Sequence, residues 1–395
     1  MNSRSASLAT LAAIAVVALS LGITACSGDD DSNWEGQTIN LGSIFSTTGD
    51  GAAFGPQQLK AAELAVNQIN TDGGVNGAEL TLAQRDDGGD PAASAKAMRG
   101  LIEDEDALAV LGPTFSNSSA EAHPVANEMK TPVLAVSNTG PGIVGDCNYP
   151  CDWIFRNSLG EAEAIPANVR EYVSTRGGGG IVDIIYPEDD AFGKSSAMTA
   201  EEALDAEPGT RAFVYPIGPD GIGNKRAYLP SATMITASSG ETVVQLIRQP
   251  RQGGEVTEPI LGGNAFNSVT TAEELGQAGK GAQSAAAWFA GNDSAENQEF
   301  ISAYRGGYGE EPDQFAAQSY TGVKLLAEAA STADLSFDDL AADREALKDS
   351  LEGVQMETPL GPFSFTADHD VNQPIWIVQM NGNGGYKLIK KIPAK

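Results

Sequence analysis

The sequence predicts an α/β protein with parallel sheets arranged in two units of similar size. Short apolar strands alternate with helical segments along the chain, and the alternation begins again after residues 153–157, "WIFRN". Strands that alternate with helices in this way form parallel sheets covered by helices on both faces. A single core stops growing at about 250 to 300 residues. The 395 residues of this chain therefore predict two domains.

The first unit is expected to end near residue 157. The apolar run 39–46, "INLGSIFS", predicts a strand, and residues 56–70 predict a helix because they open with a proline and carry apolar side chains three to four positions apart. The same order repeats. Strands are expected at 79–86, 107–113 and 132–138, one helix is expected to begin at Asp90, and another is expected over about 118–129.

The second unit is expected to repeat this layout without an obvious repetition of sequence. Its predicted strands are 179–187, 210–217, 231–239, 258–264 and 285–291, and its predicted helices include 197–204 and 241–249. Helical segments at 295–305 and 313–330 follow, and the chain closes on the strand candidates 360–366 and 374–380.

The N-terminal segment has the layout of a secretory signal peptide. Residues 5–27 carry no charge, follow Arg4 and are built from Leu, Ala, Ile and Val. The stretch 23–26, "ITAC", resembles the lipobox of bacterial lipoproteins, so residues 1–25 are the expected leader, Cys26 the lipidation site and residues 26–36 an acidic tether. A membrane-spanning helix and an incidental cysteine remain alternatives.

The charge excludes one large class of partner. The formal net charge is -29, and removal of Arg4 with the leader makes it -30. Nucleic-acid binding needs clustered Lys and Arg, which this chain lacks, so we expect no nucleic acid partner. The acidity instead predicts a soluble, self-repelling surface.

The other two cysteines lie close together in "DCNYPC". Outside the cytoplasm, a small-loop disulfide between Cys147 and Cys151 is favoured over half of a metal site, because only His123 and His369 could add imidazoles and neither is near in sequence. We predict no metal and no cofactor.

Each enzyme motif that we considered is incomplete or missing in this sequence, so we expect a protein that is not an enzyme. The glycines 177–180 precede a strand instead of following one, and the phosphate-loop match at 193–195 has Glu188 where a glycine is required. No Gly-x-Ser-x-Gly elbow is present, and a Ser-His-Asp triad would depend on one of the two histidines. The paired acids are interpreted as solvated turn residues: Asp86-Asp87 and Asp189-Asp190.

Polar loops follow two neighbouring strands of the first unit. Residues 114–119, "TFSNSS", follow one strand and run into a helix, and residues 137–140, "SNTG", follow the next. Ligands of open parallel sheets bind beyond the carboxyl ends of the strands, where hydroxyls and helix amides suit a carboxylate. Each loop taken alone could also be an ordinary helix cap.

A series of motifs in one order carries a family resemblance. The motifs are "STTGDGAAFG", "AVNQINTDGGVNG", "LTLAQRDDGGDPAAS", "AVLGPTFSNSS", "TPVLAVSNTGP" and "WIFRN". Together they resemble the branched-chain amino acid (Leu/Ile/Val)-binding family of periplasmic binding proteins of type I, which serve ABC importers as solute-binding lipoproteins. The likeness covers about 37–395 and is strongest over 37–157.

This resemblance implies two Rossmann-like lobes joined by a three-segment hinge. Lobe one would comprise 37–157 and 291–358, and lobe two 158–290 and 359–395, with crossings near Asn157, Gly291 and Pro359. A small solute would be captured between the lobes by hinge closure and handed to permease subunits. The implied protein is a monomer held by its lipid on the outer face of the cytoplasmic membrane. A ligand-sensing lipoprotein coupled to a signalling partner is the alternative.

The resemblance also implies a set of ligand-binding residues. Ser116 matches a serine that binds the ligand carboxylate. A neighbouring segment of the family binds the carboxylate and the amine, and it is matched by Ser137, Asn138 and Thr139. The implied apolar and aromatic contacts are Phe54, Phe192 and Phe315.

Two positions depart from the family pattern. Asn264 stands where amino-acid-binding members place an acid that pairs with the ligand ammonium, and Ser239 stands where an aromatic is frequent. Two ligand classes remain open: a branched-chain or other amino acid, and a related carboxylate or amide without the amine. For an amino acid, another acid could replace the missing one: Glu241, Asp190 or Asp293.

Overall fold

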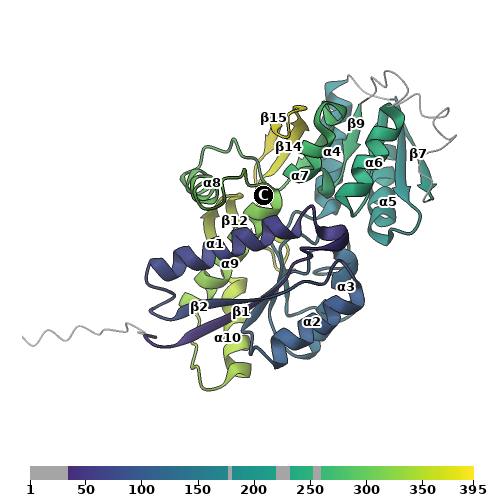
Figure 1. Cartoon of the computed structure of the whole chain (residues 1–395). Helices are drawn as coiled ribbons and strands as arrows, with labels where there is room; N and C mark the ends of the chain where they lie inside the picture. The colour runs from purple at the N-terminus through teal and green to yellow at the C-terminus, as the bar shows by residue number, and fades with distance from the viewer. Residues whose placement is uncertain (1–33, 177–179, 219–231, 252–258) are drawn as a thin grey trace, which may run out of the picture. The chain divides into compact units, whose positions relative to one another are not determined.

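The structure, a computed structural model, describes residues 34–176, 180–218, 232–251 and 259–395 (Figure 1). The expected leader, Cys26 and most of the expected tether lie outside the described residues. Among the described residues, no helix combines the length and the apolar character that crossing a membrane requires.

The first sheet contains five parallel strands in the order β2-β1-β3-β4-β5. Its strands are β1 (Thr38–Ile44), β2 (Glu79–Arg85), β3 (Ala109–Leu111), β4 (Val133–Ala135) and β5 (Ile154–Arg156). Leu41 of β1 packs in the core cluster under α1 (Gly55–Thr71) and α9 (Gln314–Thr332), whereas Ile44 packs against α2 (Pro91–Glu103) and α3 (Ser116–Glu128). The sheet is thus covered on both faces (Figure 1).

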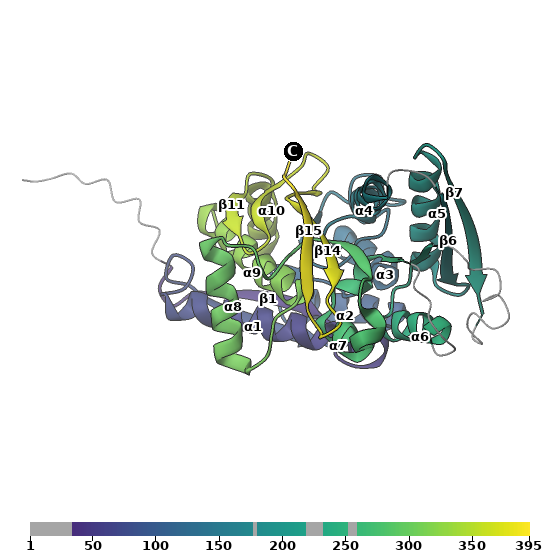
Figure 2. The same cartoon turned by 90° about the horizontal axis from the view of Figure 1, so that it is seen from above.

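The second sheet contains seven strands in the order β15-β14-β10-β9-β8-β6-β7. Its strands are β6 (Gly180–Pro187), β7 (Thr210–Ile217), β8 (Ala232–Ile235), β9 (Ile260–Gly262), β10 (Gln283–Ala286), β14 (Ile375–Met380) and β15 (Tyr386–Ile392). Strands β6 to β10 are parallel to one another. At one edge β14 pairs antiparallel with both β10 and β15, and Figure 2 shows β14 and β15 side by side.

Helices cover both faces of the second sheet as well. One core cluster combines strand residues such as Met234 with α4 (Glu161–Thr175) and α5 (Ala191–Asp205). Another combines Ile235, on the opposite face of the same strand, with α6 (Gly240–Arg251) and α7 (Val269–Leu275). The predicted fold class, α/β with parallel sheets in two lobes, is confirmed.

The chain returns to the second sheet later than the resemblance implied. A small antiparallel sheet of β11 (Gln355–Thr358), β12 (Gly361–Phe365) and β13 (Val371–Asn372) follows α8 (Ala295–Tyr308), α9 and α10 (Leu340–Glu352). Leu360, Phe363 and Val371 pack in the same cluster as β1. The return therefore occurs between β13 and Ile375, not near Pro359, because the strand "LGPFSFT" buries its apolar residues in the first core.

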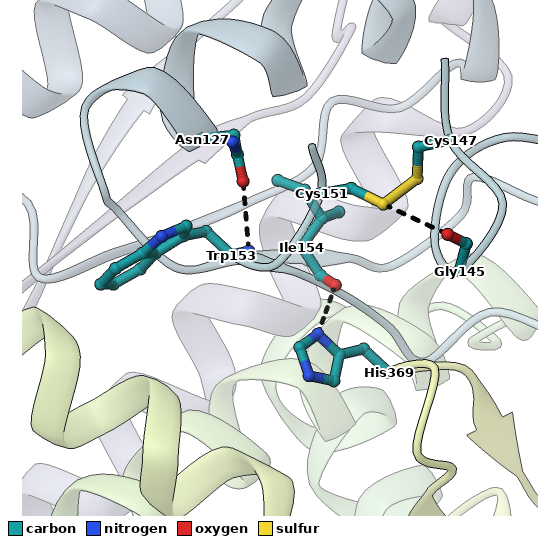
Figure 3. Close-up of a disulfide and its surroundings, with 7 residues drawn as sticks. All are labelled: Asn127, Gly145, Cys147, Cys151, Trp153, Ile154 and His369. Carbon is teal, nitrogen blue, oxygen red and sulfur yellow. Dashed lines mark hydrogen bonds between the residues drawn. A yellow bond between two sulfur atoms is a disulfide. The ribbon is translucent and has the colours of Figure 1, made fainter. Parts of the chain in front are cut away.

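A disulfide lies in the segment before β5. The sulfur atoms of Cys147 and Cys151 are bonded, with their Cα atoms 6.3 Å apart (Figure 3). Beside it, the backbone N of Trp153 donates to Asn127 Oδ1 at 3.3 Å, and His369 Nδ1 lies 3.2 Å from the carbonyl O of Ile154. These contacts fix the approach of the chain to β5.

Both histidines take part in structural contacts. His369 stacks on Phe155 with ring centroids 4.0 Å apart. His123 is fully buried, its Nε2 lies 3.2 Å from the carbonyl O of Gly112, and burial lowers its pKa to about 4. Within the described residues, no group of three His, Cys, Asp or Glu side chains is placed to hold a metal ion.

Candidate functional site

The loops that follow the strands of both sheets line a cavity of about 300 Å³, a volume that includes space open to solvent. Its wall from the first lobe comprises Phe54, Thr114, Phe115, Ser116, Ser137, Thr139 and Phe315. Its wall from the second lobe comprises Phe192, Ser238, Asn264 and Ala265. Seven of the nine ligand-binding residues expected from the sequence line this cavity, and two, Asn138 and Ser239, do not.

Helix α3 begins in the cavity wall without a capping side chain. Its N-cap residue is Phe115, which has no side-chain acceptor, and Ser116 is the first helical residue. The first amides of a helix have no acceptor within the helix, and they carry a partial positive charge. Ser116 Oγ accepts a hydrogen bond from the backbone N of Gly140 at 3.1 Å, so its proton is available to a ligand. This corner of the cavity therefore favours an anion.

The loop after β4 supplies a second hydroxyl group. Thr139 is 2% exposed, and its Oγ1 has no hydrogen-bond partner among the described residues. A buried hydroxyl without a partner is costly, so it is suited to meeting a polar atom of a ligand.

The remaining polar side chains of the two loops bond within the protein. Ser137 Oγ donates to the carbonyl O of Thr114 at 2.6 Å and accepts from Gln58 Nε2 at 3.0 Å. Asn138 is fully buried, and its Nδ2 donates to the carbonyl O of Pro113 at 2.8 Å. Both residues hold the two loops in register, and Asn138 does so away from the cavity.

Phenylalanine rings form the apolar part of the wall. Phe54 contacts Phe115 edge-on with centroids 5.9 Å apart, and it lies against Phe315 at 4.5 Å. Phe192 reaches the loop after β4 from the second lobe: its ring lies 3.3 Å from the position that a Cβ on Gly140 would occupy. The wall thus offers apolar surface from both lobes.

Asn264 spans from the second lobe to the first. Its Oδ1 accepts from Gln314 Nε2 at 2.6 Å, and its Nδ2 donates to the carbonyl O of Ser137 at 3.4 Å. Gln314 Oε1 in turn accepts from the backbone N of Ala287 at 2.7 Å. Both ends of the Asn264 amide are therefore occupied by protein groups.

Comparison with known proteins identifies the fold and its family. Residues 38–385 match the model of a family described as periplasmic binding protein. The chain belongs to this family. A "Leu/Ile/Val-binding protein homolog 7" of Brucella abortus (strain 2308) is 26% identical over 366 residues, which cover 88% of this chain and 86% of the relative.

Two solved structures resemble this periplasmic binding protein closely in fold. The branched-chain amino acid transporter substrate-binding protein LivJ of Streptococcus pneumoniae, in complex with isoleucine, has a TM-score of 0.78 and 24% identity, and covers 91% of this chain and 100% of its own. A solute-binding protein of an ABC transporter from R. palustris, in complex with benzoate, has a TM-score of 0.77 and 20% identity, and covers 91% and 97%. The prediction of a type I periplasmic binding protein of the branched-chain amino acid type is confirmed.

A buried acid that was not expected from the sequence contacts Asn264 in this binding protein. Glu161, the first residue of α4, is 3% exposed, and its Oε1 accepts from the backbone N of Asn264 at 3.3 Å. Its Oε2 accepts from the hydroxyl of Ser196. Burial, with a smaller contribution from the nearby charge of Asp190, raises the pKa of Glu161 to about 8. A lone glutamate at a helix start gives no sequence signal of such burial.

The three acids proposed from the sequence occupy other places. Asp190 caps α5, where its Oδ1 accepts from the backbone N of Gly193 at 3.0 Å and its Oδ2 from the backbone N of Ser238 at 2.7 Å. Glu241 and Asp293 are exposed and do not line the cavity. Thr114, Phe115, Ser238 and Ala265 complete the wall and were not expected individually; Thr114 and Phe115 belong to the "TFSNSS" loop.

Proposed function

We propose that this binding protein captures a small solute bearing a carboxylate between its two lobes and delivers it to an ABC importer. The observation that carries the proposal is the convergence of two donors on one cavity: the uncapped start of α3 at Ser116 and the unpartnered hydroxyl of Thr139. A carboxylate accepts several hydrogen bonds and favours a helix N-terminus.

The apolar wall and the relatives are compatible with such a ligand. The rings of Phe54, Phe115 and Phe315 can bury the hydrocarbon part of a solute while its carboxylate meets Ser116 and Thr139. Isoleucine and benzoate, the ligands named for the two solved structures, both carry a carboxylate.

Hydrogen bonds between the lobes support capture by hinge closure. Ser268 Oγ donates to the carbonyl O of Ala53 at 2.8 Å, and Asn117 Nδ2 donates to Asp190 Oδ1 at 3.4 Å. Such contacts form only when the lobes meet, and closure around a ligand is a common use of a hinge.

The decisive experiment compares two buried threonines whose hydroxyls lack a partner. Mass spectrometry of molecules released on denaturation identifies the solute, and calorimetry then measures its binding to Thr139→Val and to Thr321→Val, a control within α9. Loss of a hydrogen bond to a charged group costs about 1.5 to 3 kcal/mol, so Thr139→Val should weaken binding by about ten- to a hundredfold. The control should bind normally. Equal affinity of both variants would place the solute elsewhere.

Lipid anchoring at Cys26 is part of the same proposal, and it rests on the lipobox-like "ITAC". Labelling with a fatty-acid analogue tests it directly. Equal labelling of wild type and Cys26→Ala would rule out the anchor, and unchanged solute uptake on deletion of the gene would favour a sensing role.

A further inference from the structure

Among the residues that the structure describes, the cavity wall contains no charged side chain. Its described members are phenylalanines, one alanine, one asparagine and residues with hydroxyl groups. A carboxylate finds donors at Ser116 and Thr139, but an ammonium would find no counter-charge in the wall. Burying an ammonium without a paired charge is strongly unfavourable.

Apart from the hydroxyl of Thr139, several neutral acceptors of the wall that could replace an acid already accept a hydrogen bond within the protein. Asn264 Oδ1 accepts from Gln314, and the carbonyl O of Ser137 accepts from Asn264 Nδ2. The carbonyl O of Thr114 accepts from Ser137 Oγ, and the carbonyl O of Thr139 accepts from the backbone N of Glu161 at 2.8 Å. Each of these oxygens could accept a second donor, but none carries the negative charge that a buried ammonium needs.

The nearest acids do not supply the missing charge. Glu161 lies behind the backbone of Asn264 and outside the wall, and its raised pKa of about 8 keeps it mostly protonated at neutral pH. Asp190 uses Oδ1 for two donors, Gly193 and Asn117, and Oδ2 for a third, Ser238. Neither carboxyl group faces the cavity with a free oxygen.

The apolar wall is made of aromatic rings. Four phenylalanines of the described residues line it, and Phe54 packs on Phe315 and Phe115 in the tilted and edge-on geometries that aromatic rings prefer. An aromatic ligand can pack on such rings in the same way. Resting on the function proposed above, we propose that the ligand is an aromatic monocarboxylate without an ammonium group.

Matched pairs of probes test this inference. Calorimetry at pH 7 compares 3-phenylpropanoate with L-phenylalanine and 4-methylpentanoate with L-leucine, because the members of each pair share a skeleton and differ only in the amine. The protein is first stripped of bound solute by denaturation and refolding. The amine-free member of each pair should bind at least about tenfold more tightly, and 3-phenylpropanoate should bind most tightly of the four.

The results that would overturn this inference differ from those that would overturn the proposed function. If L-phenylalanine or L-leucine binds as tightly as its partner, or if 3-phenylpropanoate does not bind, the inference is overturned. The proposed function survives that result when Thr139→Val still weakens binding of the amino acid. It falls when Thr139→Val leaves the binding of every carboxylate unchanged.

Asn264→Asp provides a second, independent readout. The new carboxylate would stand in the wall and repel an anionic ligand, so 3-phenylpropanoate should bind at least about tenfold more weakly. L-Phenylalanine should gain relative to its partner, because its ammonium would find a counter-charge. Tighter binding of 3-phenylpropanoate to this variant would contradict the inference.

Discussion

Two helices begin beside the cavity from opposite lobes, and their N-termini differ. Helix α3 begins after Phe115, which cannot cap it, whereas α5 begins after Asp190, whose carboxylate accepts from the backbone N of Gly193. Ser116 of α3 and Phe192 of α5 both line the cavity. The protein therefore caps one helix terminus with a side chain and leaves the other without a side-chain cap.

The two lobes therefore contribute different chemical groups to the cavity wall. The first lobe offers donors for a negative charge, and the second offers a ring, an amide and a hydroxyl. A capped helix terminus adds to stability, whereas an uncapped one keeps its amides available for binding.

The largest effect is expected when a substitution introduces a carboxylate in the first turn of α3. In Ser116→Asp, the carboxylate stands in the first turn of α3 and occupies the place proposed for the ligand charge. Solute binding should fall by at least about a thousandfold, since the new charge also repels the ligand. Calorimetry measures this, with the neutral Ser116→Asn as control. Near-normal affinity of Ser116→Asp would show that the start of α3 does not bind the anion.

A third helix terminus, the start of α4, should make the stability of the folded protein depend on pH. Glu161 in its first turn has a pKa of about 8 in the folded protein, compared with an ordinary value of 4.5, because it is buried. Between these two values the folded protein holds a proton that the unfolded chain has released. Stability should therefore fall as pH rises from about 4.5 to 8, by at most about 1.4 kcal/mol per pH unit.

Glu161→Gln should remove this part of the pH dependence. The buried Asp313, with a pKa of about 6, titrates in the same window but is present in both proteins, so the difference between their urea unfolding curves isolates Glu161. The variant should gain stability relative to wild type as pH rises. Parallel pH profiles would mean that Glu161 is ionised in the folded protein.

The smallest effect is expected from removing the cap of α5. Asp190→Ala deprives the helix of its capping oxygen, which should cost about 0.5 to 2 kcal/mol of stability. It also removes the acceptor for Asn117 of the first lobe, so affinity should fall by about three- to tenfold.

The matched control for this prediction is Asp339→Ala. Asp339 caps α10 through the backbone N of Ala341 and Ala342, and it does not line the cavity. It should lose similar stability in urea unfolding and keep full affinity. An equal loss of affinity in both variants would show that contact between the lobes at Asp190 does not matter for binding.

Local sequence patterns were sufficient for most of the fold and for much of the candidate site. The alternation of strands and helices predicted the parallel strands of both sheets except β5, and the position of the polar loops after two neighbouring strands placed Ser116 and Thr139 together. These features depend on periodicity and on the rule that strand ends of a parallel sheet share one edge.

The missed features depend on tertiary contacts. Strand β15 is an edge strand with mostly exposed side chains, so it has no apolar alternation to reveal it. The burial of Glu161 and the engagement of Asn138 away from the cavity arise from neighbours far apart in sequence. The late return of the chain to the second sheet depends on which core receives Leu360 and Phe363, which their own segment does not encode.

The chain of hydrogen bonds from Ser137 through Asn264 and Gln314 to Ala287 has a kinetic consequence. It links the first lobe, the cavity wall and the segment after β10 in one series, so the lobes separate at this point only when Asn264 releases its partners. Under the proposed function, the lifetime of the complex is then governed by how frequently these bonds break together. Variants of Gln314 should change the dissociation rate far more than the association rate.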